Sequence, residues 1–271
     1  MSRKRPQTHA FTLNAVCLQC TGRHHLRAGE PCQDSVFFDC TDRLAFFGLA
    51  DGQSGKRYSA EGGQLALRAL CHTLRGRTLE ELEQLRYPDE LQYQLLHAVR
   101  TALQAKAAQY QVSEEEFAST LMLLMIDRCT GRCMYLHLGD GTLFGIPADG
   151  AAQTLSVPDN GWLAHSTWLT TSGSALLHLR VRFGSILPYR HLLLLTDGAP
   201  AFACVGGITR RTGETPVRSA AECLRQALLR AQPMDDATCL LLTLEHVPNN
   251  GQKSSNSVAE AGNICYNFIS I

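Results

Sequence analysis

The first part of the chain has the apolar alternation of β-strands. Residues 11–20 alternate loosely between apolar and polar side chains, and residues 36–40 and 44–50 are apolar runs separated by a three-residue turn. A period of two is typical of strands, and so short a turn allows only antiparallel pairing. Residues 22–34 are mostly polar and predict a loop. We therefore expect antiparallel strands at the start of the fold.

Two helices are expected next. Residues 59–74 carry an apolar stripe at helical spacing, and a second stripe follows Pro88, with apolar residues four apart from Leu91 to Leu103. Proline suits the first turn of a helix, where its missing N–H costs nothing. A Gly-Gly pair at 62–63 is unfavourable inside a helix, so it indicates that another backbone packs closely there.

The pattern then returns to strands. Residues 121–126 and 134–146 predict a long hairpin, and residues 191–195 form an apolar run that ends in Thr-Asp-Gly. A helix is expected at 218–231, after a Gly-, Thr- and Arg-rich loop, and a last strand at 236–244. Antiparallel strands with helices in pairs indicate a layered α+β domain and not a βαβ array.

The domain is expected to span residues 10–246. Neither a repeat nor a linker interrupts it, and residues 247–271 predict a flexible C-terminal tail. The 271 residues are 45% hydrophobic and 18% charged, which is ordinary for a soluble globular protein. Because the net charge is zero, nothing points to a nucleic-acid or membrane partner.

A cytoplasmic location is expected. No window approaches the ~20 apolar residues that span a bilayer, and polar residues interrupt the basic N-terminus where a signal peptide would be apolar. Eleven scattered cysteines fit a reducing compartment. Cys17-x-x-Cys20 has no second pair to complete a zinc site, so core thiols are favoured over a metal or redox role.

Aspartates recur at the ends of the apolar runs. Asp34, Asp51, Asp197 and Asp236 each stand where a strand begins or ends, and Asp140 lies within the predicted hairpin. Carboxylates gathered at one edge of a sheet would repel one another without a cation, and Mg²⁺ or Mn²⁺ prefers such oxygen ligands. Each Asp-Gly pair taken singly is also typical of a plain turn.

These aspartates lie in a set of six short motifs, whose order along the chain resembles that of a known family. They are Cys32-Gln33-Asp34-Ser35, Ala50-Asp51-Gly52-Gln53-Ser54-Gly55, Ala118-Ser119-Thr120-Leu121, Leu138-Gly139-Asp140-Gly141, Leu195-Thr196-Asp197-Gly198 and Asp235-Asp236-Ala237-Thr238. Over residues 12–245 the chain resembles the metal-dependent type 2C serine/threonine protein phosphatases. The opening Gly22-x-x-His25-x3-Gly29-x-x-Cys32-Gln33-Asp34 looks most like a bacterial branch.

The resemblance implies a four-layer α-β-β-α sandwich with two central antiparallel sheets and paired helices outside. It implies two Mn²⁺ or Mg²⁺ ions at one edge of the sandwich. Asp51 would bridge both ions and Gly52 would lend its carbonyl, while Asp197 and Asp236 would complete the first site. Asp34 would act at the second ion, directly or through a water.

The implied reaction is hydrolysis of phosphoserine and phosphothreonine by a water that bridges the two ions. Asp51 and Asp34 would be the residues closest to the chemistry, and no covalent nucleophile is needed. Gln33 and Gln53 stand where the family usually has an acidic residue and a histidine. Ala201 stands where it often has an aspartate, so Asp140 is weighed as a third-metal ligand against a structural role.

Arg23, His25 and Arg27 are the candidates for binding phosphate, because guanidinium groups match phosphate geometry. The alternative is a solvated basic loop. The expected partner is a phosphorylated protein, the substrate of a cognate serine/threonine kinase. Two other functions stay open: a non-catalytic binding module of the same fold, and a phosphatase of small phosphorylated metabolites. An open site would favour protein substrates, and a deep pocket would favour metabolites.

Overall fold

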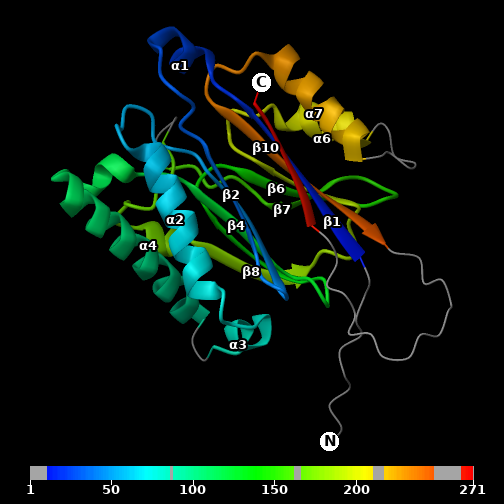
Figure 1. Cartoon of the computed structure of the whole chain (residues 1–271), viewed down its shortest axis with the longest axis horizontal. Helices are drawn as coiled ribbons and strands as arrows, with labels where there is room; N and C mark the ends of the chain where they lie inside the picture. Colours follow the sequence, from blue (N-terminus) through cyan, green and yellow to red (C-terminus); the bar gives the residue numbers. More distant parts are fainter. Residues whose placement is uncertain (1–10, 86–87, 162–165, 210–216, 247–263, 271) are drawn as a thin grey trace, which may run out of the picture.

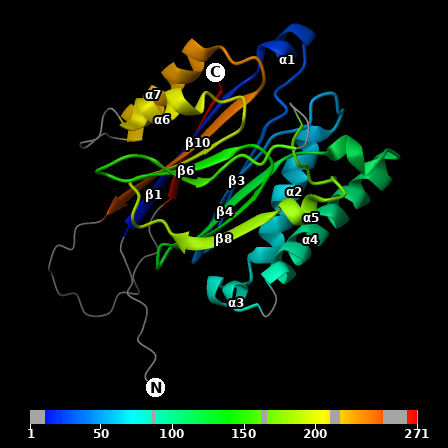
Figure 2. The ribbon, with the colours of Figure 1, turned by 180° about the vertical axis from the view of Figure 1, so that it is seen from behind.

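The computed structural model describes residues 11–85, 88–161, 166–209, 217–246 and 264–270. Two β-sheets pack face to face, and helices cover both outer faces (Figure 1). Figure 2 shows the same layers from behind, with α6 and α7 on one side and α2 and α4 on the other. The predicted α+β sandwich is therefore confirmed. Residues 1–10 lie outside the described residues.

One sheet has six strands in the order β11-β1-β10-β9-β6-β7. Its strands are β1 (Phe11–Cys20), β6 (Thr142–Ile146), β7 (Gln153–Ser156), β9 (His191–Leu195), β10 (Ala237–His246) and β11 (Ile264–Ser270). Neighbours are antiparallel except β1 and β11, which run parallel. Strand β11 belongs to the segment expected as a tail, of which residues 247–263 lie outside the described part. A domain boundary at residue 246 stays a prediction.

The other sheet has five strands in the order β2-β3-β4-β5-β8, all antiparallel to their neighbours. Its strands are β2 (Ser35–Cys40), β3 (Leu44–Ala50), β4 (Leu121–Asp127), β5 (Arg132–Leu138) and β8 (Arg180–Ser185). The predicted hairpin holds for β4 and β5 but not beyond. Gly139 follows the last residue of β5 and has a φ of 110°, which favours glycine. After it the chain crosses to β6 in the opposite sheet. Asp140 therefore lies in a crossover and not within a strand.

The helices are α1 (Arg23–Ala28), α2 (Ser59–Leu74), α3 (Leu79–Glu83), α4 (Pro88–Tyr110), α5 (Ala175–His178), α6 (Ala201–Thr209) and α7 (Val217–Ala231), with a 3₁₀ turn at Glu114–Phe117. The three helices expected from periodicity are present. Helix α1 replaces part of a predicted loop, because contacts with distant residues hold it. Helix α3 has a capping box between Thr78 and Glu81, a signal visible in the sequence.

Strand β3 is buried on both faces, which explains its continuous apolar sequence. Phe46 belongs to the core between this sheet and α2 and α4, whereas Phe47 belongs to the core between the two sheets. A third core lies between the six-stranded sheet and α6 and α7. The close packing expected at the Gly-Gly pair is confirmed, since a Cβ on Gly62 would stand 2.0 Å from the Phe117 carbonyl oxygen.

Antiparallel register brings the acidic turns to one end of the sandwich. Ser35 pairs with Ala50 in the five-stranded sheet, and Leu195 pairs with both Thr142 and Cys239 in the other. The start of one strand thus lies beside the end of its neighbour. The turns beyond these ends carry Asp34, Asp51, Asp140, Asp197 and Asp236. Within the described residues, no helix has the length and apolarity needed to cross a bilayer.

Candidate metal centre

Asp51 follows the last residue of β3, and its backbone is fixed by Thr120. The Asp51 N–H donates to the Thr120 hydroxyl at 2.8 Å, and the Thr120 N–H donates to the Asp51 carbonyl at 2.8 Å. Next to them the Gln53 N–H donates to the Ala118 carbonyl at 3.0 Å. None of these bonds uses the carbonyl of Gly52. The carboxylate of Asp51 is therefore carried on a rigid backbone at the end of a buried strand.

Three carboxylates from distant parts of the chain meet at this point. One oxygen each from Asp51, Asp140 and Asp197 lies within 4.8 Å of the others. Asp51 and Asp140 are partly buried, whereas Asp197 is exposed. The structure thus brings together three of the aspartates singled out in the sequence, at a spacing that suits shared cation ligands.

The electrostatics of the cluster are unfavourable without a cation. Burial and the charges of Asp34, Asp197 and Asp140 raise the pKa of Asp51 well above its ordinary value. Burial and the charge of Asp197 raise the pKa of Asp140 to about 6. Carboxylates that lie close together and are partly removed from water stay protonated to a higher pH, because their charged forms repel one another. A bound cation offsets this repulsion.

Asp34 lies beside this cluster and is almost completely buried. Its Oδ2 accepts hydrogen bonds from the hydroxyls of Thr196 at 2.9 Å and Thr238 at 2.6 Å. Burial raises the pKa of Asp34 to about 7, although the two hydroxyls oppose the shift. The charge of Asp34 in turn raises the pKa of Asp51, so the two carboxyl groups belong to one electrostatic unit.

The donor set fits Mn²⁺ or Mg²⁺. Oδ1 of Asp34 and Oδ1 of Asp140 are buried and accept no hydrogen bond in the described structure. In the same part of the chain, neither they nor Asp51 and Asp197 pair with a lysine or arginine. Unpartnered buried carboxylate oxygens are costly, and hard divalent cations are their natural partners.

Asp236 is placed differently from the expectation. Its Oδ1 accepts from the Gly22 N–H at 2.7 Å, and its Oδ2 accepts from the Gln33 N–H at 2.5 Å and lies 2.8 Å from Nδ1 of His25. Both oxygens are engaged, and the residue is only 2% exposed. The structure therefore brings Asp236 to His25 and not into the Asp51 cluster.

Asp235 is the neighbour that sequence reasoning missed. It is exposed, and one of its carboxylate oxygens lies within 4.8 Å of ligand atoms of His25 and Asp236, while its charge also contributes to raising the pKa of Asp140. Both residues precede β10, which begins at Ala237, and Oδ1 of Asp235 accepts the Asp236 N–H at 2.9 Å. The Asp235-Asp236 doublet was therefore a usable signal, because both oxygens of Asp236 are engaged and Asp235 is the member of the pair with an exposed carboxylate.

The three phosphate candidates lie on α1 but do not share a face of it. His25 is 7% exposed and faces inward, and its hydrogen bond with Asp236 raises its pKa although burial opposes this. Nε2 of His25 lies 3.8 Å from Glu30. Arg23 and Arg27 are exposed. The structure brings His25 to Asp236 and leaves the two arginines on the surface.

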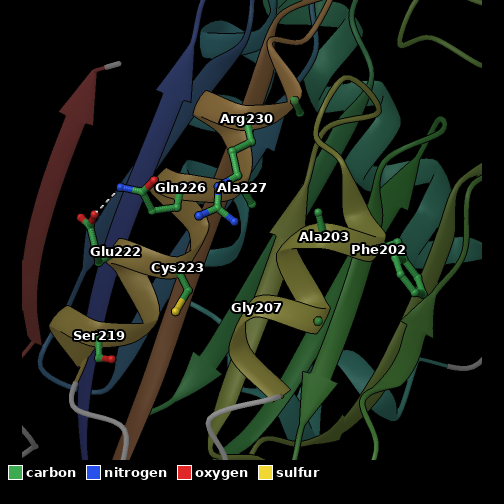
Figure 3. A pocket seen from close by; sticks show the side chains of 11 residues that line it. Phe202, Ala203, Gly207, Ser219, Glu222, Cys223, Gln226, Ala227 and Arg230 are labelled. Atoms are coloured by element: carbon green, nitrogen blue, oxygen red, sulfur yellow. Dashed lines mark hydrogen bonds between the residues drawn. The ribbon is translucent and has the colours of Figure 1, made fainter.

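Among the described residues, neither the cysteine pair of β1 nor the groove between α6 and α7 forms a second metal centre, and the other group of possible metal ligands is His25, Asp235 and Asp236. Cys17 and Cys20 stand three residues apart on β1, so their side chains point to opposite faces and cannot share an ion. A groove of about 720 Å³ runs between α6 and α7, lined by small residues such as Gly207 and Ala227 and by the exposed Phe202 (Figure 3). None of the aspartates named above lines this groove.

Comparisons with known proteins agree with this geometry. The family model described as "Protein phosphatase 2C" matches residues 21–241. No curated protein sequence matches the chain.

Solved bacterial structures share the fold over nearly their whole length. The serine/threonine phosphatase Stp1 from Staphylococcus aureus matches with a TM-score of 0.64 at 12% identity, covering 90% of this chain and 100% of that one. The catalytic domain of the phosphatase PstP in complex with two manganese ions matches at 0.59 and 20%, covering 87% and 99%. RsbX in complex with magnesium matches at 0.54 and 15%, covering 84% and 94%.

Proposed function

Since the chain belongs to the protein phosphatase 2C family, we propose that its acidic end hydrolyses phosphoserine and phosphothreonine in proteins with the help of two Mn²⁺ or Mg²⁺ ions. The observation that carries the proposal is the meeting of Asp51, Asp140 and Asp197 within 4.8 Å. These residues come from three different turns, and no lysine or arginine of the described residues pairs with their carboxylates.

The proposed ligands are four carboxylates and one carbonyl. Asp51 is the proposed bridging ligand, with Asp140 and Asp197 within 4.8 Å of it and with the carbonyl of Gly52, the next residue. Asp235, which lies beside His25 and Asp236, is proposed to turn its exposed carboxylate to the same ions. Asp235 takes the place in this set that the sequence suggested for Asp236. When bound, two divalent cations supply Lewis acidity, which neutralises phosphoryl oxygens and makes a water molecule more acidic.

Asp34 is not among these ligands and has a different role in the proposal. Thr196 and Thr238 hold its Oδ2, so its free Oδ1 is fixed in direction. A carboxyl group with a pKa near neutrality exchanges its proton readily at physiological pH. Asp34 is therefore proposed to orient the attacking water and accept its proton, while Gln53, which has no acidic proton, takes no part in proton transfer.

Protein substrates fit the accessibility of the cluster. Asp197 and Asp235 are exposed, so the acidic end is open to a phosphorylated loop of a second protein. We propose a phosphorylated protein, the substrate of a serine/threonine kinase in the same cytoplasm, as the physiological partner. The structurally similar catalytic domain of PstP, which is in complex with two manganese ions, supports the two-ion assignment.

The proposal is tested by hydrolysis of an aryl phosphate with and without added Mn²⁺. We expect turnover that depends on Mn²⁺ in the wild type and a loss of at least about 100-fold in kcat for Asp51→Asn, since electrostatic groups at a reacting centre contribute this much. Asp149→Asn, which removes a carboxylate from an exposed loop, should leave kcat unchanged. Absence of metal-dependent turnover in the wild type would contradict the proposal and favour a binding module.

A further inference from the structure

Helix α1 is anchored from inside and presents a basic face to the solvent. The His25 ring faces inward to Asp236, and the N–H groups of Arg23 and His24 donate to the carbonyls of Pro233 and Met234 at 3.1 Å each. These bonds fix a short helix that could not be stable alone. Its exposed face is therefore held in a defined place.

Three residues of this helix lie on one face. Arg23, Leu26 and Arg27 have the spacing i, i+3, i+4, which brings side chains together on a helix, and all three are exposed, Leu26 by 63%. Among the described residues, neither guanidinium group forms a hydrogen bond or ion pair. Two unpaired guanidinium groups with a leucine between them are thus available to a partner.

The helix stands directly beside the proposed metal centre. A Cβ on Gly22, the residue before α1, would lie 2.3 Å from the carbonyl carbon of Asp235, so the two backbones are in contact. Asp236 also binds Gln33, the residue before Asp34. An extended peptide advances about 3.3 Å per residue, so the arginines can reach side chains within a few residues of a phosphate held at Asp51.

We propose that Arg23, Leu26 and Arg27 form a docking face for acidic substrate segments, in which Asp or Glu residues flank the phosphorylated serine or threonine. Charge complementarity identifies acidic segments as the partner of this face. Its two unpaired guanidinium groups match carboxylates, and Leu26 adds an apolar contact between them. Two nearby carboxylates oppose this choice: Glu30, which lies beyond the end of the helix close to His25, and Asp235, which lies on the metal-centre side of His25. The inference rests on the proposed phosphatase activity and names its substrate class.

The test compares two phosphoserine peptides of equal length that carry either Glu or Gln on both sides of the phosphoserine. We expect the wild type to prefer the Glu peptide about fivefold in kcat/KM, and added salt to reduce this preference because the contact is exposed. In R23E/R27E the preference should fall to one or reverse. Because each variant is measured on both peptides, any effect on the chemistry cancels in the ratio.

The control variant is Arg182→Glu, which makes one Arg-to-Glu change at an exposed position of β8 in the other sheet and should keep the preference. A ratio of one in the wild type, an unchanged ratio in R23E/R27E, or an equal loss in R182E would overturn the inference. Hydrolysis of an aryl phosphate separates this failure from failure of the phosphatase assignment, because that substrate has no flanking residues.

Discussion

Nδ1 of His25 lies 2.8 Å from Oδ2 of Asp236, although 211 residues separate the two along the chain. The same carboxylate accepts from the N–H groups of Gly22 and Gln33. Asp236 therefore joins the start of β10, the start of α1 and the segment that carries Asp34. It organises the surroundings of the metal centre without being placed to bind an ion there.

Substituting the two adjacent aspartates should separate these roles. Asp236→Ala leaves three donors without an acceptor, two of them buried, so we expect the free energy of unfolding of the metal-free protein to fall by about 2–4 kcal/mol. Asp235→Ala removes an exposed carboxylate and should leave stability nearly unchanged while weakening Mn²⁺ binding. Urea denaturation and calorimetric titration measure the two effects. A destabilised Asp235→Ala beside a stable Asp236→Ala would reverse the assignment.

Binding of Mn²⁺ should strengthen as the pH rises. Burial raises the pKa of Asp34 to about 7 in the metal-free protein, so this raised pKa stabilises the fold at low pH and the contribution is lost as pH rises through about 7. A cation favours the deprotonated forms of Asp34 and of the proposed ligands Asp51 and Asp140, whose pKa values are also raised, so we expect an affinity at least about tenfold higher at pH 8 than at pH 6. Calorimetry in buffers of different ionisation enthalpy counts the protons released. Asp34→Asn should reduce this number and weaken the pH dependence without abolishing it.

Two buried histidines should make the fold sensitive to acid. Burial and the charge of Arg180 lower the pKa of His137 to about 3, and burial lowers that of His191 to about 4. The unfolded chain takes up these protons first, so stability is present above about pH 6.5 and is lost as the pH falls toward 4.

For each histidine the expected loss is about 1.4 kcal/mol per pH unit within that window. Urea denaturation between pH 7.5 and 4.5 measures it. His191→Gln should reduce the slope, whereas His97→Gln, at an exposed position of α4, should leave the slope as it is. Equal slopes in all three proteins would contradict the explanation.

A methyl group on Gly62 should disturb both stability and activity. Its Cβ would overlap the Phe117 carbonyl, and the following residues, Ala118 to Thr120, hold the backbone around Asp51. We expect Gly62→Ala to cost about 1–3 kcal/mol, the range of overpacked sites, and to lower kcat. The control is Gly76→Ala, where a Cβ would meet nothing within 4 Å. Thermal unfolding and aryl phosphate hydrolysis measure the two effects.

Much of the fold could be predicted because its strands and helices are amphipathic or fully buried. Strand β3, for example, is apolar throughout since Phe46 and Phe47 face two different cores. The six-residue helix α1 could not be predicted, because it depends on Asp236 and on carbonyls 210 residues away. The crossover at Gly139 could not be predicted either, because the apolar pattern of β5 resumes in β6 soon after Gly139.

The site could be predicted in part. Asp34, Asp51, Asp140 and Asp197 were each singled out as an aspartate near a strand end, and the structure brings the last three within 4.8 Å of one another, with the charge of Asp34 acting on Asp51. The choice between Asp235 and Asp236 could not be made from composition or motif, because both precede the same strand. It depends on which side chain faces inward, and that is set by the hydrogen bonds of Asp236 to Gly22, His25 and Gln33.

The most direct measurement is a crystal structure of the protein with bound Mn²⁺, in which anomalous scattering counts the ions. The account predicts two ions, with Asp51 bound to both at about 2.1 Å and with Asp197 and Asp235 among the other ligands. Asp236 should keep its bond to His25 and touch neither ion. Ions bound at His25 and Asp236, or the absence of any ion at Asp51, would contradict the account.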